Sequence, residues 1–287
     1  MSILQIFNLS VLAVKKNGKL ALLWFGASLV TALVSSLPLN SFLNTTIGNS
    51  LESLKLAEGM DYTVFTDLMN NYGVATGSIM NASILMVLLF MVFNLFFQAG
   101  WMASRAQAFL DDQTENIWPL GAQFFLRFLL ISILFTVFQG VWLFICFQFF
   151  MNMTNGMNVF TMESEQVITQ SLWIFVLLLV IGNTLLRLAS DYTKAHVVNE
   201  SKGFSFKILG TGFRAIFRKL GKVFGLYGLI LVSMGAIWGV YTVLAGFIPE
   251  DSSLAFIGFL IFQVYAFFRI VIRMVHMASV VQVEKLN

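Results

Sequence analysis

Charged residues are scarce in this chain of 287 residues. Only 11% of the residues are charged, whereas 58% are hydrophobic. A water-soluble domain of this length needs a polar shell that so few charged side chains cannot supply. The mean hydropathy of +0.84 indicates the same. The composition therefore excludes a soluble globular protein and predicts an integral membrane protein.

Cysteine and catalytic motifs are also scarce. Cys146 is the sole cysteine, which excludes a disulfide framework within the chain and a cysteine-based metal cluster. The sequence contains no HExxH pair, Walker loop, nucleophile elbow or kinase signature. His196 and His276 have no local set of metal ligands, and we expect His196 to lie on a solvated face. The sequence thus predicts no enzyme activity, no cofactor and no metal site.

Long hydrophobic runs are what the chain has instead. A bilayer core requires about 20 apolar residues in a helix, and these runs are too long for barrel strands and lack alternation. Backbone groups in lipid must be satisfied within the segment, which requires helices. We therefore expect one all-α membrane domain over 1–287, a six-helix bundle with spans at about 20–38, 79–101, 124–150, 168–190, 223–247 and 254–275.

The basic residues are distributed unevenly around these spans. Sixteen of the 17 Lys and Arg residues fall on one side, whereas the other side has Lys55 against eight acids. Because basic residues resist translocation, we expect the basic side to be cytoplasmic. Six spans then place both termini in the cytoplasm.

The segment ILQIFNLSVLAV (3–14) precedes the first span. Lys15 and Lys16 follow this apolar run, which is the reverse of the order in a signal peptide. Twelve residues are too few to cross the bilayer. We expect an interfacial helix that lies along the inner leaflet.

A second amphipathic segment covers 204–220. Phe213, Ile216, Phe217 and Leu220 share one face of the expected helix, which should be buried in lipid or against the bundle. Glycines 210 and 212 should weaken this helix and could break it. The opposite face carries the candidate contacts to anionic lipid headgroups, which are Lys207, Arg214, Arg218 and Lys222.

Nucleotide and nucleic-acid partners are not expected from the same segment. GTGFRA (210–215) matches a dinucleotide fingerprint, but that motif requires a preceding strand in a βαβ unit. A DNA-binding element would have to stand clear of the bilayer, and phenylalanines fill the other face of this helix.

Polar side chains inside the spans are the remaining candidate site. They either form a polar path or headgroup pocket or hydrogen-bond neighbouring helices. The predicted spans contain no Asp or Glu, which argues against cation-coupled transport. GKVFG (221–225) and GAIWG (235–239) place glycines four residues apart and predict close helix approach. The candidate polar residues are Asn94, Gln98, Gln139, Asn183, Arg187 and Gln263.

Two further patterns concern the organisation of the bundle. In the outer loop 39–78, apolar residues at helical spacing predict a short helix over 61–72 against the outer surface. The tripeptides MAS (102–104), LAS (188–190) and MAS (277–279) follow every second span, which suggests three helical hairpin repeats. The alternative is that small residues are simply common near helix ends.

The layout of helical hairpins, together with ASDYTKAHVVNES (189–201) before a basic amphipathic stretch, resembles one family. This is the six-helix membrane domain attached to some bacterial glycerophosphodiester phosphodiesterases, with its stand-alone relatives. The hydrolase barrel of those enzymes is not expected here, so no catalytic residue is implied. The resemblance implies a bacterial inner-membrane protein that works near lipids or alongside a protein partner.

Two functions remain open from the sequence. The first is a non-enzymatic scaffold or membrane subunit of an assembly. The second is a transporter or lipid-handling pore that uses the polar span residues. A cavity lined by Asn94, Gln98, Asn183 and Arg187 would favour the second, and a close-packed bundle that pairs them would favour the first.

Overall fold

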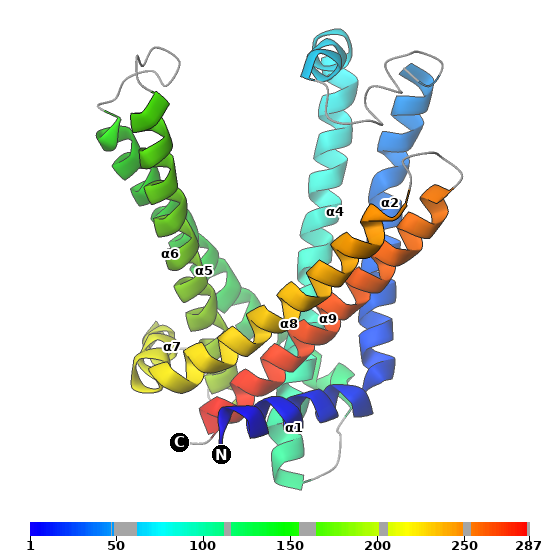
Figure 1. Ribbon diagram of the computed structural model, residues 1–287. Helices are drawn as coiled ribbons and strands as arrows, with labels where there is room; N and C mark the ends of the chain where they lie inside the picture. The colour runs from blue at the N-terminus through cyan, green and yellow to red at the C-terminus, as the bar shows by residue number, and fades with distance from the viewer. Residues whose placement is uncertain are drawn as a thin grey trace. The chain divides into compact units, whose positions relative to one another are not determined.

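A computed structural model describes residues 1–46, 48, 62–111, 116–154, 165–200, 206–248 and 254–285. Apart from single turns, the secondary structure in these ranges is entirely α-helical, which confirms the predicted all-α class (Figure 1). They are α1 (Ile3–Lys16), α2 (Gly18–Thr46), α4 (Tyr62–Asp111), α5 (Ile117–Met153), α6 (Glu165–Glu200), α7 (Phe206–Arg218), α8 (Leu220–Gly246) and α9 (Ala255–Lys285).

Six of these helices are long and apolar enough to cross a membrane, as predicted. The chain is therefore a multi-pass integral membrane protein. The candidate spans are Gly18–Thr46, Asn81–Ala108, Ile117–Met153, Thr169–Glu200, Leu220–Gly246 and Phe256–Lys285.

Three helices continue well beyond their predicted ends. Residues 102–111, 191–200 and 276–285 were expected outside the spans, but they form the last turns of α4, α6 and α9. The reason is visible in α6, where Leu188, Tyr192 and Ala195 keep helical spacing among charged neighbours. Hydropathy reports where a helix leaves the lipid, and not where the helix ends.

The chain divides into two compact units, and residues 17–95 form one of them. In this unit α2 contains Pro38, and α4 has a kink at Tyr72, where φ is −127° and ψ is 26°. The Tyr72 ring packs edge-on against Phe42 of α2, with 6.0 Å between centroids. The helix predicted over 61–72 is confirmed from Tyr62 onward, and it joins the span through this kink. Residue 61 and most apolar side chains of this segment lie outside the described residues.

The other unit consists of residues 1–16 and 96–287. Its two hairpins, α5 with α6 and α8 with α9, each pack side by side (Figure 1). In the first hairpin, Trp142 lies over Gly182, and its Nε1 donates to the Leu178 carbonyl at 3.3 Å. A Cβ atom at position 182 would collide with the indole. The absence of a side chain at Gly182 therefore leaves the space that the Trp142 indole occupies between the two helices.

Helix α1 forms where the sequence predicts an amphipathic helix, and Lys15 and Lys16 occupy its last turn. Its buried residues, Ile6, Ser10 and Val14, share one face. This face packs on α9, where the Ser279 hydroxyl donates to Ser10 Oγ at 2.9 Å. The helix is therefore held by the protein itself through one face.

Helix α7 packs on α6 and runs without a break from Phe206 to Arg218. The expectation that Gly210 and Gly212 could break it is wrong. Gly212 lies directly against Thr193 and Ala189, where a Cβ atom would overlap the α6 backbone. The low helix propensity of glycine is offset there by close helix packing.

Most of the glycines in α8 do not have the role that their spacing predicts. A Cβ atom at Gly221, Gly235 or Gly239 would meet nothing within 4 Å, so close helix approach at these positions is not found. Gly225 is the exception, since a Cβ atom there would meet Ile3 of α1. Spacing alone therefore does not identify the packed face of this helix.

Candidate functional site

The most completely buried region of the chain lies at the ends of α4, α6 and α9, where α1 and α7 also pack. We call this region the end core. In residues 274–284 of α9, every side chain except His276 is buried. A helix that is buried on all sides must be surrounded by other helices. The end core consists of residues 97–106, 188–198 and 274–284, with Ile6, Ser10 and Val14.

Trp101 joins α4 to α9 at the centre of the end core. The side chain is 0% exposed, and its Nε1 donates to the Met274 carbonyl at 2.9 Å. A buried indole N–H requires such an acceptor. Lys285 of α9 donates in the opposite direction, to the Ala106 carbonyl at 2.9 Å. The two helices are thus connected by hydrogen bonds from each to the backbone of the other.

Both histidines of the chain pair with carboxylates on another helix. Asp191 Oδ2 of α6 lies 3.2 Å from His276 Nε2 of α9, and His196 Nδ1 of α6 lies 3.0 Å from Glu284 Oε1 of α9. Glu200 adds a contact of 3.4 Å to His196 Nε2. The expectation that His196 lies on a solvated face is therefore wrong. Its partner is 88 residues away in sequence, so no local motif could reveal the pair.

Two cationic side chains, Lys194 inside the end core and Lys219 beside it, lie against a ring and a backbone acceptor. Lys194 is buried near Asp191, with its ammonium 5.8 Å from the Phe128 ring centre. Lys219, between α7 and α8, donates to the Val283 carbonyl of α9. Partial burial lowers the pKa of Lys219, because desolvation disfavours the charged ammonium. These contacts connect α5, α6 and the α7–α8 junction to one another through the end core.

The chemistry of the end core is that of interhelical pairing. Tyr227 places its ring edge-on to His276, with 6.2 Å between centroids. Within the part of the chain that the structure describes, no group of three or more His, Cys, Asp or Glu side chains could hold a metal ion. Asp191, His276, His196 and Glu284 are therefore best explained as groups that fix α6 against α9.

The six predicted polar span residues are spread over four helices. Asn94 belongs to the 17–95 unit, whereas Gln98 belongs to the other unit and is buried. Arg187 is exposed, and the remaining three side chains, Gln139, Asn183 and Gln263, are half-buried. None of the six lines the cleft at Tyr241 and Tyr265 or the small pocket at Arg105.

The helix predicted over 204–220 ends earlier than expected, at Arg218, and Lys219 separates it from α8, so that Leu220 and Lys222 belong to α8. The predicted basic residues nevertheless have the expected exposure. Arg214, Arg218 and Lys222 are exposed, whereas Ile216 on the opposite face is buried. The side chain of Lys207 lies outside the described residues.

The apolar face of α7 is only partly covered by protein. Phe213 is half-buried and stacks on Phe135 of α5, with 6.1 Å between ring centroids. Phe217 and Leu220 remain exposed at the protein surface. The surface formed by α7 and the first turn of α8 therefore combines three exposed cations with two exposed apolar side chains.

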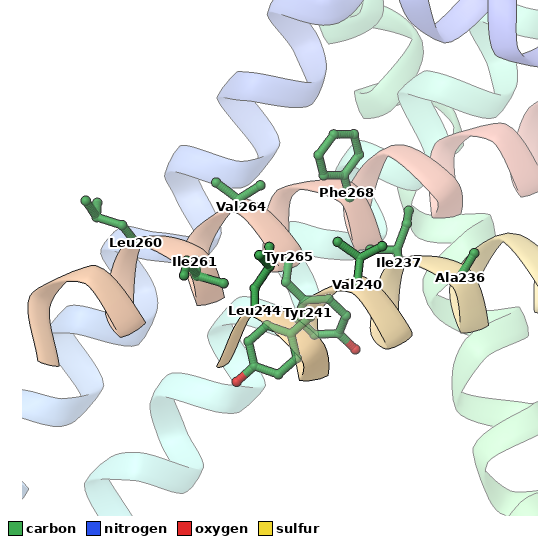
Figure 2. A pocket seen from close by; sticks show the side chains of 10 residues that line it. All are labelled: Ala236, Ile237, Val240, Tyr241, Leu244, Leu260, Ile261, Val264, Tyr265 and Phe268. Atoms are coloured by element: carbon green, nitrogen blue, oxygen red, sulfur yellow. The ribbon is translucent and has the colours of Figure 1, made fainter. Parts of the chain in front are cut away.

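An apolar cleft of about 420 Å³ lies between α8 and α9 (Figure 2). Tyr241 and Tyr265 stack at 4.8 Å between ring centroids and join the two helices within it. The cleft is formed by side chains from two helices, so the sequence of either helix alone does not indicate it. Its lining residues are Ala236, Ile237, Val240, Tyr241, Leu244, Leu260, Ile261, Val264, Tyr265 and Phe268.

Comparisons with known proteins add no assignment to these sites. No protein-family model, curated protein or solved structure matches the chain. The resemblance to the membrane domain of glycerophosphodiester phosphodiesterases stays a prediction. Any function has to be inferred from the residues described above.

Proposed function

We propose that this chain is a non-enzymatic scaffold or membrane subunit of a larger assembly. The observation that carries this proposal is the pairing of the ionisable side chains in the end core. Asp191 with His276, and His196 with Glu284, each connect α6 to α9. Both pairs are at least partly shielded from solvent, and removing one member leaves the other without its partner, so such pairs favour one arrangement of the helices that carry them.

The outer faces of the spans support the same proposal. Large apolar side chains stay exposed along α5, α6, α8 and α9, including Trp173, Val232 and Phe256. In a bilayer such faces contact lipid or the helices of a partner. A scaffold uses surfaces of this kind to hold other membrane chains.

Chemical crosslinking in intact membranes tests this proposal. Residues on the exposed faces of α5, α6 and α8 are replaced one at a time by a photoreactive amino acid, with Trp173 and Val232 as the first positions. We expect a crosslinked species of defined mass that forms from one face. Crosslinks to lipid alone from every face would contradict the scaffold proposal.

The proposed location is a bacterial inner membrane with both termini in the cytoplasm. The partition of 16 basic residues to one side and one to the other supports this orientation. Reporter fusions after Asn287 and within 151–167 should read opposite sides of the membrane. A periplasmic C-terminus would contradict the orientation.

Anionic lipid headgroups are the proposed partners of the exposed cations on α7 and the first turn of α8. Arg214, Arg218 and Lys222 are exposed together, and each cation near an anionic leaflet gains about 1 kcal/mol. Replacing all three by Glu should reduce the anionic lipid that crosslinks to α7 in nanodiscs. Nanodiscs of neutral lipid give the control, in which the substitutions should change little.

Lipid handling is a second candidate function, and the apolar cleft between α8 and α9 favours it. The cleft lies within two candidate spans and could accept an acyl chain (Figure 2). Val240→Trp would fill it, and Val232→Trp on the exposed face of α8 is the matched control. If purified chain moves labelled lipid across proteoliposomes, V240W should slow the movement and V232W should not. No movement by the unmodified chain would contradict this candidate.

A further inference from the structure

A small pocket lies among α1, α4 and α9, separate from the apolar cleft. Its volume is about 150 Å³, and its lining residues are Leu9, Ala13, Arg105, Ala108 and Gln282. All five belong to the same compact unit of the chain. A single water requires only about 10–15 Å³ by this measure. The pocket therefore has room for a group larger than one water.

Arg105 supplies the positive charge of this pocket. The side chain is 9% exposed, and its Nε is buried without a hydrogen-bond partner. Its Nη2 donates to Ser104 Oγ at 3.4 Å, and the guanidinium lies 4.7 Å from the Trp101 ring centre. Among the ion pairs of the described residues, none joins Arg105 to a carboxylate.

A buried guanidinium without a counter-charge is costly, since desolvation penalises the ion. An oxyanion would supply that charge, and the planar fork of arginine fits phosphate and carboxylate oxygens. The guanidinium that lines the pocket thus has one contact with the Trp101 ring and one unused N–H donor, at Nε. Arg105 is thus arranged to receive an anion.

Gln282 narrows the chemistry of that anion. The side chain is 6% exposed, and its Oε1 is buried without a hydrogen-bond partner. An amide oxygen accepts hydrogen bonds, so a ligand that satisfies it carries a donor close to its anionic oxygens. A carboxylate alone has no donor. A phosphate group with a protonated oxygen or a neighbouring hydroxyl offers both.

We propose that this pocket binds a phosphate-class anion, with Arg105 on its anionic oxygens and Gln282 accepting from a hydroxyl beside them. The same chemistry is present in free phosphate and in the headgroup of a phosphoglycerol lipid. Leu9 and Ala13 of α1 close one side of the site, which makes α1 part of it. This site is separate from the basic face of α7, and it does not depend on the proposed scaffold function.

The first test uses free phosphate and the full chain in non-ionic detergent. Unfolding temperature is measured with inorganic phosphate and with chloride at equal ionic strength. If the ligand is a free anion, phosphate raises the unfolding temperature of the unmodified chain and of Lys15→Gln, an exposed cation on α1. Arg105→Gln should weaken the phosphate effect at least tenfold in concentration, because it removes a charge-assisted contact.

The second test uses lipid. The chain is reconstituted in nanodiscs of phosphatidylglycerol or of phosphatidylcholine, and lipid retained after detergent extraction is counted by native mass spectrometry. If the ligand is a headgroup, one phosphatidylglycerol stays on the unmodified chain and on K15Q. R105Q should lose it, and Gln282→Leu should hold it several-fold less well.

Arg105→Lys keeps the variant testable if R105Q does not fold, since it preserves the charge and loses the fork. R105K should bind the anion several-fold more weakly than the unmodified chain. The proposal is overturned if R105Q and R105K match K15Q in both tests. It is also overturned if the unmodified chain responds to neither phosphate nor phosphatidylglycerol.

Discussion

Large apolar side chains are buried between helices in the end core, whereas along the spans many of them are exposed on the outer faces of the helices. In the end core Trp101 is 0% exposed, whereas Trp173 on the α6 span is 69% exposed. The first side chain has a hydrogen-bond acceptor on another helix, and the second lies on an open apolar face. The same residue type is thus used for packing at one end and for a lipid-compatible surface along the span.

This contrast follows from the two surroundings. Between helices in lipid there is no hydrophobic driving force, because lipid tails are as apolar as the side chains. The end core carries charged side chains such as Arg105, Asp191 and Glu284, and where such helix ends stand in water, burial removes apolar surface from water and is favourable. The protein therefore concentrates its interhelical hydrogen bonds and ion pairs where packing gains most. The end core should consequently dominate the stability of this unit.

Replacing the two tryptophans is the strongest test of the contrast. Trp101→Ala removes a fully buried indole and its hydrogen bond to Met274, and should lower the free energy of unfolding by about 3–5 kcal/mol. Trp173→Ala should change it by less than about 0.5 kcal/mol. Unfolding by a denaturing detergent in mixed micelles gives both values. Equal losses would remove the distinction between the two regions.

Gly182 tests whether a close contact inside a span also contributes to stability. Gly182→Leu would drive a side chain into Trp142, and overpacking should cost about 1–3 kcal/mol. Gly140→Leu on the same hairpin meets open space and serves as the control. The same unfolding assay compares them. If G182L is as stable as G140L, the α5–α6 hairpin is not held by this contact.

A double-mutant cycle isolates the contribution of one ion pair of the end core to stability. Asp191→Asn, His276→Ala and the double variant should show a coupling of about 0.5–3 kcal/mol, since the side chains are in contact across α6 and α9. Arg218→Gln combined with H276A provides an additive control, because Arg218 is an exposed residue of α7. Additivity in both cycles would show that the Asp191–His276 contact does not stabilise the protein.

The smallest expected effect concerns the glycines on the open side of α8. Gly239→Ala should raise the free energy of unfolding by about 0.5–1 kcal/mol, because alanine favours the helix and a Cβ atom there meets nothing within 4 Å. Gly212→Ala, in contact with the α6 backbone, should lower it. A loss of stability in G239A would indicate that this face packs against another helix.

The sequence predicts the helices better than it predicts their contacts. Six spans, α1 and α7 follow from apolar length and amphipathic spacing, which are local properties. The exposure of Arg214 and Arg218 follows from the same helical spacing. These features need no knowledge of which helices are neighbours.

The end core could not be predicted in the same way. Trp101 and Met274 are 173 residues apart, and Asp191 and His276 are 85 residues apart. The charges after Leu188 lower the hydropathy, and the predicted span therefore ends at residue 190. One signal was present, since Leu188, Tyr192 and Ala195 continue the helical spacing beyond the predicted end. The contact partners themselves require the fold.

The position of α9 at the centre of the end core has a consequence for the order of biosynthesis. A ribosome makes α1, α4 and α6 before it makes the last turns of α9, yet all three contact those turns. The faces of the earlier helices that α9 covers therefore stay exposed until α9 has been translated and inserted. Domains generally fold in order of synthesis, but in this unit closure of the end core is set by the helix translated after the others. A stalled or truncated chain that lacks 274–284 would keep its first five candidate spans and still have no end core.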